Sequence, residues 1–416
     1  MRVVLVSSVF PPEHTFSSQT NAQTAEELVR RGHEVHVYAP FPSHPKGRLF
    51  DGYQRTLYTT STTDAGYTLT HCFGTFSRRS TLVSRFAWNL SFGITSGVRI
   101  LFGRRPDVIF SSTWPIFATG ILAMVAELRR VPFVLRVQDV YPESLDSQRR
   151  FTKRNWVYRL LRQFDQMIAR SSQQVLVISP AFYEVYVNDR GVPADKVHVI
   201  PNWSSDEMVD ADRSAAPAFR QKLGIPEDAF VAVYAGNVGV ASNAELLVKA
   251  LAILKDRAQI HLVIAGEGAQ LGACRDEAER QVLDRVVIHT PWKTEETGPV
   301  IKMADVLLLP TKGRQSLNSI PSKLITYFLS GRPVIAAVLS ESDIAAAIFE
   351  SGAGWVVNPD SAELMAEAIL AASEQSPETL NRMGSAGREY ALENHSRESN
   401  LSRLVDFVEM TGKVAE

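Results

Sequence analysis

The residues best suited to bind an anion lie between Asn318 and Ala337, in the stretch NSIPSKLITYFLSGRPVIAA. Pro321 predicts the first turn of a helix, which ends at a glycine before a buried strand. Lys323 lies in that first turn, where a cation is unfavourable for the helix itself. The first amides would point out of the helix N-terminus: those of Ser319, Ile320 and Ser322. Together with the helix dipole they favour a phosphate site; an ordinary capped helix is the alternative.

Polar residues also follow buried strands in the first half of the chain. RVQDVYPES places Arg136, Gln138 and Asp139 at the end of a strand, where polar groups are more often functional than structural. The loop SSVFPPEHTFSSQTN follows the first strand. Its candidate polar residues are Glu13, His14, Ser17 and Ser18. These groups are candidates for binding a ligand at the carboxyl ends of the strands.

A matching loop, YAGNVG, follows the first strand of the second half and offers Asn237 and Gly239. Neither this loop nor AGEGAQ contains G-x-G-x-x-G, so the dinucleotide fingerprint is absent. We therefore expect the phosphates to bind at the helix of Lys323.

The elements that must position these residues alternate between short β-branched strands and amphipathic helices. This alternation is typical of βαβ units with a parallel sheet buried on both faces. The pattern lapses between His198 and Pro217, as in a linker. We predict two doubly wound α/β domains, residues 1–203 and 204–390, and a C-terminal helical segment, 391–416, able to pack on the first domain. Ligands of such sheets bind at the strand carboxyl ends, so two facing sheets would form one cleft.

The composition excludes several other classes of protein. The chain has 416 residues and a formal net charge of −1, so it has no overall attraction to nucleic acid. Its two cysteines, Cys72 and Cys274, lie far apart, which argues against a disulfide framework and a zinc site. The N-terminal apolar run is short and ends in Pro-Pro, so we interpret it as a strand and not as a signal peptide.

Residues 76–105 depart from this ordinary composition. No Asp or Glu occurs between Ala65 and Pro106, whereas six arginines alternate with Trp88 and several Phe, Leu and Ile residues. This pattern is typical of a helix lying in a membrane interface. A core helix with arginines reaching out to solvent remains the alternative. A transmembrane span is not expected, because Arg85, Asn89 and Arg99 interrupt the apolar run.

Several of these motifs resemble one family over nearly the whole chain: PPEH, VQDVYPES, VIPNW, YAGNVG, VIAGEG and IPSKLITYFLSGRPVIA. They resemble family 4 retaining glycosyltransferases, which have the GT-B fold of two facing Rossmann-like domains with a cleft between them. The branch they resemble builds bacterial O-antigen, capsule and colanic acid. The resemblance implies an acceptor in the N-terminal domain and a nucleotide sugar in the C-terminal domain. The polar residues of the first half would then bind the acceptor, and Asp139 or Glu13 would orient or deprotonate its hydroxyl.

The sequence departs from that family at several site positions. The resemblance implies two glutamates separated by seven residues, one contacting the donor sugar and the other the ribose, where this chain has Asn318 and Thr326. Losing a charge-assisted pair of hydrogen bonds costs on the order of 1.5–3 kcal/mol if nothing compensates. The other departures are Ser17 and Ser18 for paired glycines, Gln138 for His, and Asn237 and Ser242 for the usual Arg and Lys. The charge facing a diphosphate would come from Lys323 first, and otherwise from Arg314, Lys312 or Arg136.

We therefore expect a glycosyltransferase. It would move a hexosyl or N-acetylhexosaminyl group from a nucleoside diphosphate sugar, with UDP favoured, to a polyprenyl-diphosphate-linked saccharide. It would need no cofactor or metal and would work at the cytoplasmic face of the membrane, with retention implied by the resemblance alone. Two alternatives stay open: a nucleotide-sugar epimerase on the same fold, and a non-catalytic scaffold with a degenerate donor site.

Overall fold

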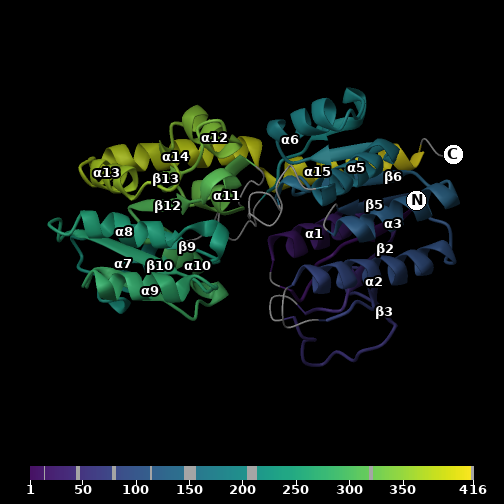
Figure 1. Cartoon of the computed structure of the whole chain (residues 1–416), viewed down its shortest axis with the longest axis horizontal. Coiled ribbons are helices and arrows are strands. Elements are labelled where there is room, and N and C mark those ends of the chain that lie inside the picture. Colours follow the sequence, from purple (N-terminus) through teal and green to yellow (C-terminus); the bar gives the residue numbers. More distant parts are fainter. Residues whose placement is uncertain are drawn as a thin grey trace. The chain divides into compact units, whose positions relative to one another are not determined.

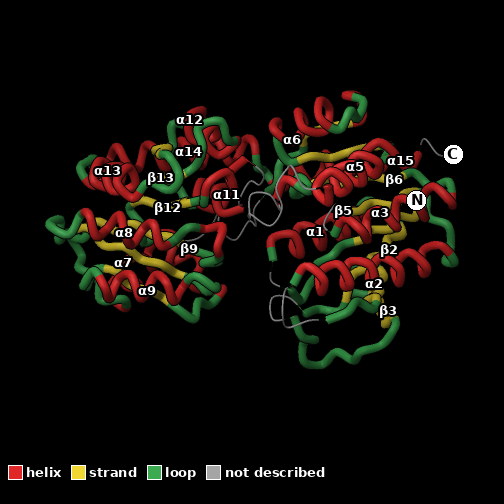
Figure 2. Tube along the Cα trace, in the orientation of Figure 1, coloured by secondary structure: helices red, strands yellow, loops and turns green. Residues whose placement is uncertain are grey.

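The computed structural model describes residues 1–13, 15–43, 47–76, 81–112, 115–144, 156–203, 213–317 and 322–413 (Figure 1). Two compact units make up the chain: Met1–Asn202 with the segment from Glu398 onward, and Trp203–Arg397. Strands alternate with helices in each of them (Figure 2). We call them unit 1 and unit 2. Five predicted site residues lie outside the described part: His14, Asn318, Ser319, Ile320 and Pro321.

The sheet of unit 1 has eight strands in the order β3-β4-β2-β1-β5-β6-β7-β8. All neighbours are parallel except β3 and β4, which add an antiparallel edge that the sequence analysis did not predict. The strands are β1 (Arg2–Val6), β2 (Glu34–Pro40), β3 (Tyr58–Thr62), β4 (Thr68–Cys72), β5 (Val108–Ser112), β6 (Phe133–Val137), β7 (Gln174–Val177) and β8 (Val197–Val199).

The helices of unit 1 connect these strands. They are α1 (Phe16–Arg30), α2 (Leu82–Leu101), α3 (Ile116–Arg129), α5 (Trp156–Ser171), α6 (Pro180–Glu184) and α15 (Arg397–Lys413). The last of them returns to the N-terminal region: Arg31 pairs with Asp406, and His33 contacts Glu409 at 2.8 Å. The C-terminal helix is therefore part of unit 1.

The sheet of unit 2 has six parallel strands in the order β11-β10-β9-β12-β13-β14. They are β9 (Phe230–Ala235), β10 (Ile260–Ala265), β11 (Val286–His289), β12 (Val306–Pro310), β13 (Val334–Ala337) and β14 (Gly354–Val357). Alternate β9 residues join different cores: Val231 and Val233 pack with α11, whereas Ala232 and Tyr234 pack with α8. Both faces of the sheet are therefore buried, as the near-continuous apolar strands predict.

The helices of unit 2 are α7 (Ala216–Lys222), α8 (Glu245–Ile253), α9 (Leu271–Arg280), α10 (Thr297–Lys302), α11 (Ser322–Leu329), α12 (Asp343–Ser351), α13 (Ala362–Ser373) and α14 (Pro377–Asn394). The domain boundary expected at residue 390 falls inside α14, and the two units divide after Arg397. Packing explains this difference, because Gly384 and Gly387 bring α14 against the backbone of Gly331 and the ring of Phe328.

Candidate functional site

Two glycine-containing loops meet at the carboxyl ends of β9 and β10 in unit 2. The amide of Gly236 donates to the carbonyl of Ala265 at 2.8 Å, and the amide of Val238 to that of Glu267 at 2.8 Å. A Cβ atom on Gly266, whose φ is +151°, would lie 1.9 Å from the carbonyl oxygen of Gly236. Only glycine allows so close an approach of two backbones.

Lys323 reaches this pair of loops from the first turn of α11. Its ammonium lies 4.0 Å from the centroid of the Tyr234 ring and donates to the Tyr234 hydroxyl. The side chain also covers Gly236, where a Cβ would lie 2.5 Å from its Cε. Burial lowers the pKa of Lys323 to about 7, because desolvation disfavours the charged form. Tyr234 was not among the predicted residues, although it is the first residue of the YAGNVG motif and lies near the end of the strand.

Tyrosine hydroxyls fix this arrangement to the sheet. Tyr327, buried one turn after Lys323, accepts from the amide of Ala235 at 3.0 Å and donates to its carbonyl at 3.1 Å. Tyr234 donates to the carbonyl of Asn237 at 2.6 Å, which holds the first glycine loop. The start of α11 is therefore tied to the end of β9 through side chains from both elements.

The remaining predicted donor residues surround this position. Ser322 and Thr326 are partly buried in α11, and the Thr326 hydroxyl donates to the Ser322 carbonyl at 3.3 Å. Asn237 is exposed on the first loop, followed by Gly239. Ser242 donates to the carbonyl of Gly239 at 2.7 Å. The structure thus brings the described donor candidates to one edge of the unit 2 sheet.

A chain of polar side chains lies at the corresponding edge of unit 1. Arg136 is buried on β6 and donates to Asn202 Oδ1 at 2.9 Å, and the Asn202 amide donates to Gln138 Oε1 at 3.0 Å. Burial lowers the pKa of Arg136 to about 9. Asp139 follows, and burial raises the pKa of its carboxyl to about 6. A carboxyl in this range can accept a proton near neutral pH.

The first loop of unit 1 is anchored by Glu13. Its buried carboxylate accepts from the amide of Ser43 at 2.7 Å, which ties two loops together. Thr15 caps α1 by accepting from the Ser18 amide at 3.1 Å, and Ser17 is partly buried beside it. Within the described residues, the buried Ser18 hydroxyl has no hydrogen-bond partner. Glu13 therefore has a structural role, holding the loop of Ser43 through a hydrogen bond, and its catalytic role stays a prediction.

A buried ion network holds the loop that follows Asp139. Arg190 is fully buried and contacts Asp165 at 2.9 Å and Glu143 at 2.7 Å. It also donates to the carbonyl of Tyr141 at 3.1 Å. Arg190 was not among the predicted residues, because nothing in the local sequence marks an arginine about fifty residues further on as a partner of this loop.

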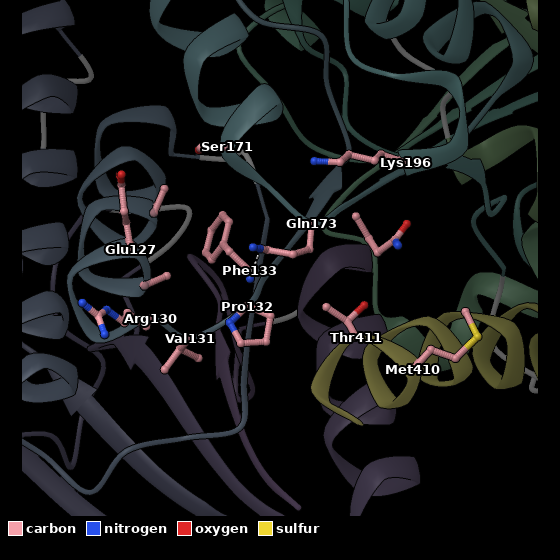
Figure 3. Close-up of a pocket in the computed structure, with 13 residues that line it drawn as sticks. Glu127, Arg130, Val131, Pro132, Phe133, Ser171, Gln173, Lys196, Met410 and Thr411 are labelled. Carbon is pink, nitrogen blue, oxygen red and sulfur yellow. Dashed lines mark hydrogen bonds between the residues drawn. The ribbon is translucent and has the colours of Figure 1, made fainter. Parts of the chain in front are cut away.

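A cavity of about 840 Å³ lies elsewhere in unit 1, at the amino ends of β6 and β7 (Figure 3). Phe133, Gln173, Lys196 and Met410 contribute to its walls, and the Gln173 side chain accepts from the Phe133 amide at 2.7 Å. None of the predicted site residues lines it. Because it lies at the opposite ends of the strands from Gln138 and Asp139, it is separate from the polar edge described above.

The helix predicted to contact a membrane is now defined by its packing. Phe92 is buried, whereas Phe86, Ile94 and Val98 are exposed, so α2 packs by one face and exposes apolar side chains on the other. Arg78 and Arg79 lie outside the described residues.

No helix in the described ranges is both long and apolar enough to cross a bilayer. Nor do those ranges contain a group of three or more His, Cys, Asp or Glu side chains placed to hold a metal ion.

Comparison with known proteins identifies the class of the chain. Residues 17–203 match the glycosyl transferase 4-like domain, and residues 229–375 match the glycosyl transferases group 1 domain. The structure of HepE from Anabaena in complex with UDP-glucose has a TM-score of 0.71 at 15% identity and covers 99% of this chain and 100% of that one. WaaG, a glycosyltransferase involved in lipopolysaccharide biosynthesis, has a TM-score of 0.69 at 16% identity, covering 98% and 99%. The fold and the two domains are those of a GT-B glycosyltransferase.

Within that class, the chain belongs to the family that joins a glycosyl transferase 4-like domain to a group 1 domain. WcaI of Escherichia coli K12, named for colanic acid biosynthesis, is 23% identical over 98% of this chain and 100% of its own. WbjE of Pseudomonas aeruginosa, named as a glycosyltransferase, is 26% identical over 73% and 75%. The predictions of fold, family and enzyme class are therefore confirmed, whereas the roles of individual site residues stay predictions.

Proposed function

We propose that the chain transfers a sugar from a nucleoside diphosphate sugar, a UDP-sugar first of all, to a polyprenyl-diphosphate-linked saccharide during synthesis of a bacterial surface polysaccharide. Unit 2 would bind the donor and unit 1 the acceptor, with retention of configuration at the anomeric carbon. The observation that carries this proposal is Lys323, placed by α11 over the glycine loops at the carboxyl ends of β9 and β10.

The proposed reaction breaks the bond between the anomeric carbon and a diphosphate oxygen, and the acceptor oxygen forms the new bond. Negative charge then builds up on the departing diphosphate. The Lys323 ammonium would stabilise that charge, together with the first amides of α11. The proposal routes no step through a metal, because Lys323 supplies the positive charge. In unit 1, Asp139 would accept the proton of the acceptor hydroxyl, and its raised pKa suits that exchange.

The names of similar proteins support the chemical classes in this proposal. HepE is described with UDP-glucose, which favours a UDP-sugar donor. WcaI is named for colanic acid, which favours a surface polysaccharide as the product. A lipid-linked acceptor would bring the reaction to the cytoplasmic surface of the membrane, where the exposed apolar side of α2 provides a contact.

A thermal-shift series with UDP, GDP, ADP, dTDP and CMP, with and without magnesium, tests the donor assignment. A ligand at 100 times its Kd stabilises the protein by about 2.7 kcal/mol, which corresponds to a few degrees in Tm. We expect a selective shift with UDP, lost in Lys323→Ala and kept in the control Lys249→Ala, whose lysine lies exposed on α8 and pairs with Glu245. Turnover should fall at least about ten-fold in Lys323→Ala. No shift with any nucleotide at millimolar concentration would favour a non-catalytic scaffold instead.

A further inference from the structure

Three helices form one continuous layer on unit 1. Gly93 and Gly97 let α2 pack closely on Ala118 and Ile121 of α3, and Gly120 lets Phe164 of α5 contact α3. Aromatic rings connect all three helices. The ring centroid of Phe117 on α3 lies 5.0 Å from that of Phe86 on α2 and 5.7 Å from that of Phe164 on α5. The outer sides of α2 and α5 are therefore parts of the same surface.

That surface is apolar along both outer helices. On α2 and at its C-cap, the exposed apolar residues recur every three or four positions: Val83, Phe86, Leu90, Ile94, Val98 and Phe102. On α5 the exposed apolar residues are Trp156, Leu160 and Met167, which follow one another by four and seven positions and so lie on one side of the helix; Trp156 is 73% exposed. Met124 and Leu128 are exposed on α3 between them. A monomeric protein in water rarely leaves so many neighbouring apolar side chains uncovered.

The charges of the layer are almost all positive. Its arginines are Arg85 and Arg99 on α2, Arg129 on α3, and Arg159, Arg162 and Arg170 on α5. Two acidic residues occur in these helices. Glu127 is exposed, whereas Asp165 is buried against Arg190. An apolar surface bordered by arginines complements a bilayer that contains anionic lipids.

We propose that α2 and α5 act together, across α3, as one docking face for an anionic membrane surface. This inference rests on the proposed function, because a lipid-linked acceptor places the enzyme at a membrane. It extends the contact beyond residues 76–105 to α5, whose sequence by itself predicts only a helix of the α/β pattern. Contacts through two helices would fix the orientation of unit 1 on the bilayer, whereas contact through a single helix would let unit 1 rotate about the axis of that helix.

Co-sedimentation of the full chain with vesicles of phosphatidylglycerol and phosphatidylcholine, compared with phosphatidylcholine alone, tests this face. The α5 variant Leu160→Gln/Met167→Gln and the α2 variant Phe86→Gln/Ile94→Gln each keep the net charge. Each should weaken binding to the anionic vesicles about ten-fold or more, because binding scales with the buried apolar area. The matched control is Phe349→Gln on α12 of unit 2, where the phenylalanine is 63% exposed; it should bind as wild type.

The depth of Trp156 provides a second readout that does not depend on a loss of binding. Brominated lipids should quench the fluorescence of the wild type more than that of Trp156→Phe. Wild-type binding by the α5 variant, or equal quenching in the two proteins, would refute the inference. So would variants that dissolve a dimer in gel filtration while vesicle binding persists, because the face would then belong to a second copy.

A failure of the docking face can be told apart from a failure of the proposed function. The nucleotide-induced shift in Tm and the transfer to a water-soluble acceptor should be the same in the α2 and α5 variants as in the wild type. Membrane binding without any nucleotide response would instead leave the docking face standing and refute the donor assignment.

Discussion

The pH dependence of donor binding gives the most direct test of Lys323. Its pKa of about 7 means that the free site is half protonated near neutrality. A bound diphosphate favours the ammonium, so binding above pH 7 must take up a proton. Below pH 7 the lysine is already charged and contributes no pH dependence. Donor affinity should therefore fall as the pH rises above 7, by up to about ten-fold per pH unit.

The assay is isothermal titration of the nucleotide sugar at pH 8 in buffers with different ionisation enthalpies. A nucleotide sugar is preferable to a nucleoside diphosphate, whose terminal phosphate titrates near pH 6. We expect an uptake of close to one proton in the wild type, and none in Lys323→Arg, whose guanidinium stays charged. Equal donor affinities at pH 6.5 and 8.5, with no proton uptake, would refute this account of the site.

The free energy of unfolding should change with pH in the opposite direction to donor affinity. Because the fold lowers the lysine pKa from 10.5 to about 7, protonation destabilises the folded state. At about 1.36 kcal/mol per tenfold change in equilibrium, this penalty reaches about 4 kcal/mol at pH 7 as an upper bound. Lys323→Met should then raise the Tm at pH 7 by about 3 °C or more. The gain should shrink as the pH approaches 10.5 and should be absent if the ammonium is well solvated.

Three further predictions concern residues that shape the two units. Gly266→Ala should destabilise unit 2 by at least about 2 kcal/mol in urea unfolding, because its Cβ would lie 1.9 Å from the Gly236 carbonyl oxygen. Arg190→Met should cost unit 1 about 3–5 kcal/mol by leaving buried carboxylates unpaired, and wild-type unfolding would exclude the network as a support. Asp139→Asn should lower kcat, and wild-type kcat should fall below pH 6 as the carboxyl becomes protonated; a flat profile would remove it as the base.

The sequence predicted the parallel architecture well, because strands buried on both faces are nearly continuous apolar runs that alternate with amphipathic helices. It also placed Asn237 and Asp139 at strand carboxyl ends, since that position follows from the strand boundary alone, and it placed Lys323 in the first turn of a helix. It did not predict which other side chains hold these residues in place. The Lys323–Tyr234 and Arg190–Glu143 contacts join segments 89 and 47 positions apart, and no local periodicity reports such pairs.

Burial lowers the pKa of Lys323, and one of the sequence departures, Thr326, lies close enough to bear on the charge of that lysine. Thr326 lies three residues after Lys323 in α11, so the two side chains share one side of the helix. A carboxylate at position 326, which the family resemblance implies, would hold the neighbouring lysine in its charged form. Thr326→Glu should therefore raise the pKa of Lys323 and reduce the proton uptake on donor binding.

The same substitution also tests the ribose contact. If a carboxylate at 326 pairs with the ribose hydroxyls, the donor KM of Thr326→Glu should fall by about ten-fold. Thr326→Gln should hydrogen-bond to the ribose without raising the pKa of Lys323. Proton uptake measured in both variants separates the two effects. An unchanged KM together with a lost proton uptake would mean that the ribose is held elsewhere, while unchanged proton uptake would show that residue 326 does not control the charge of Lys323.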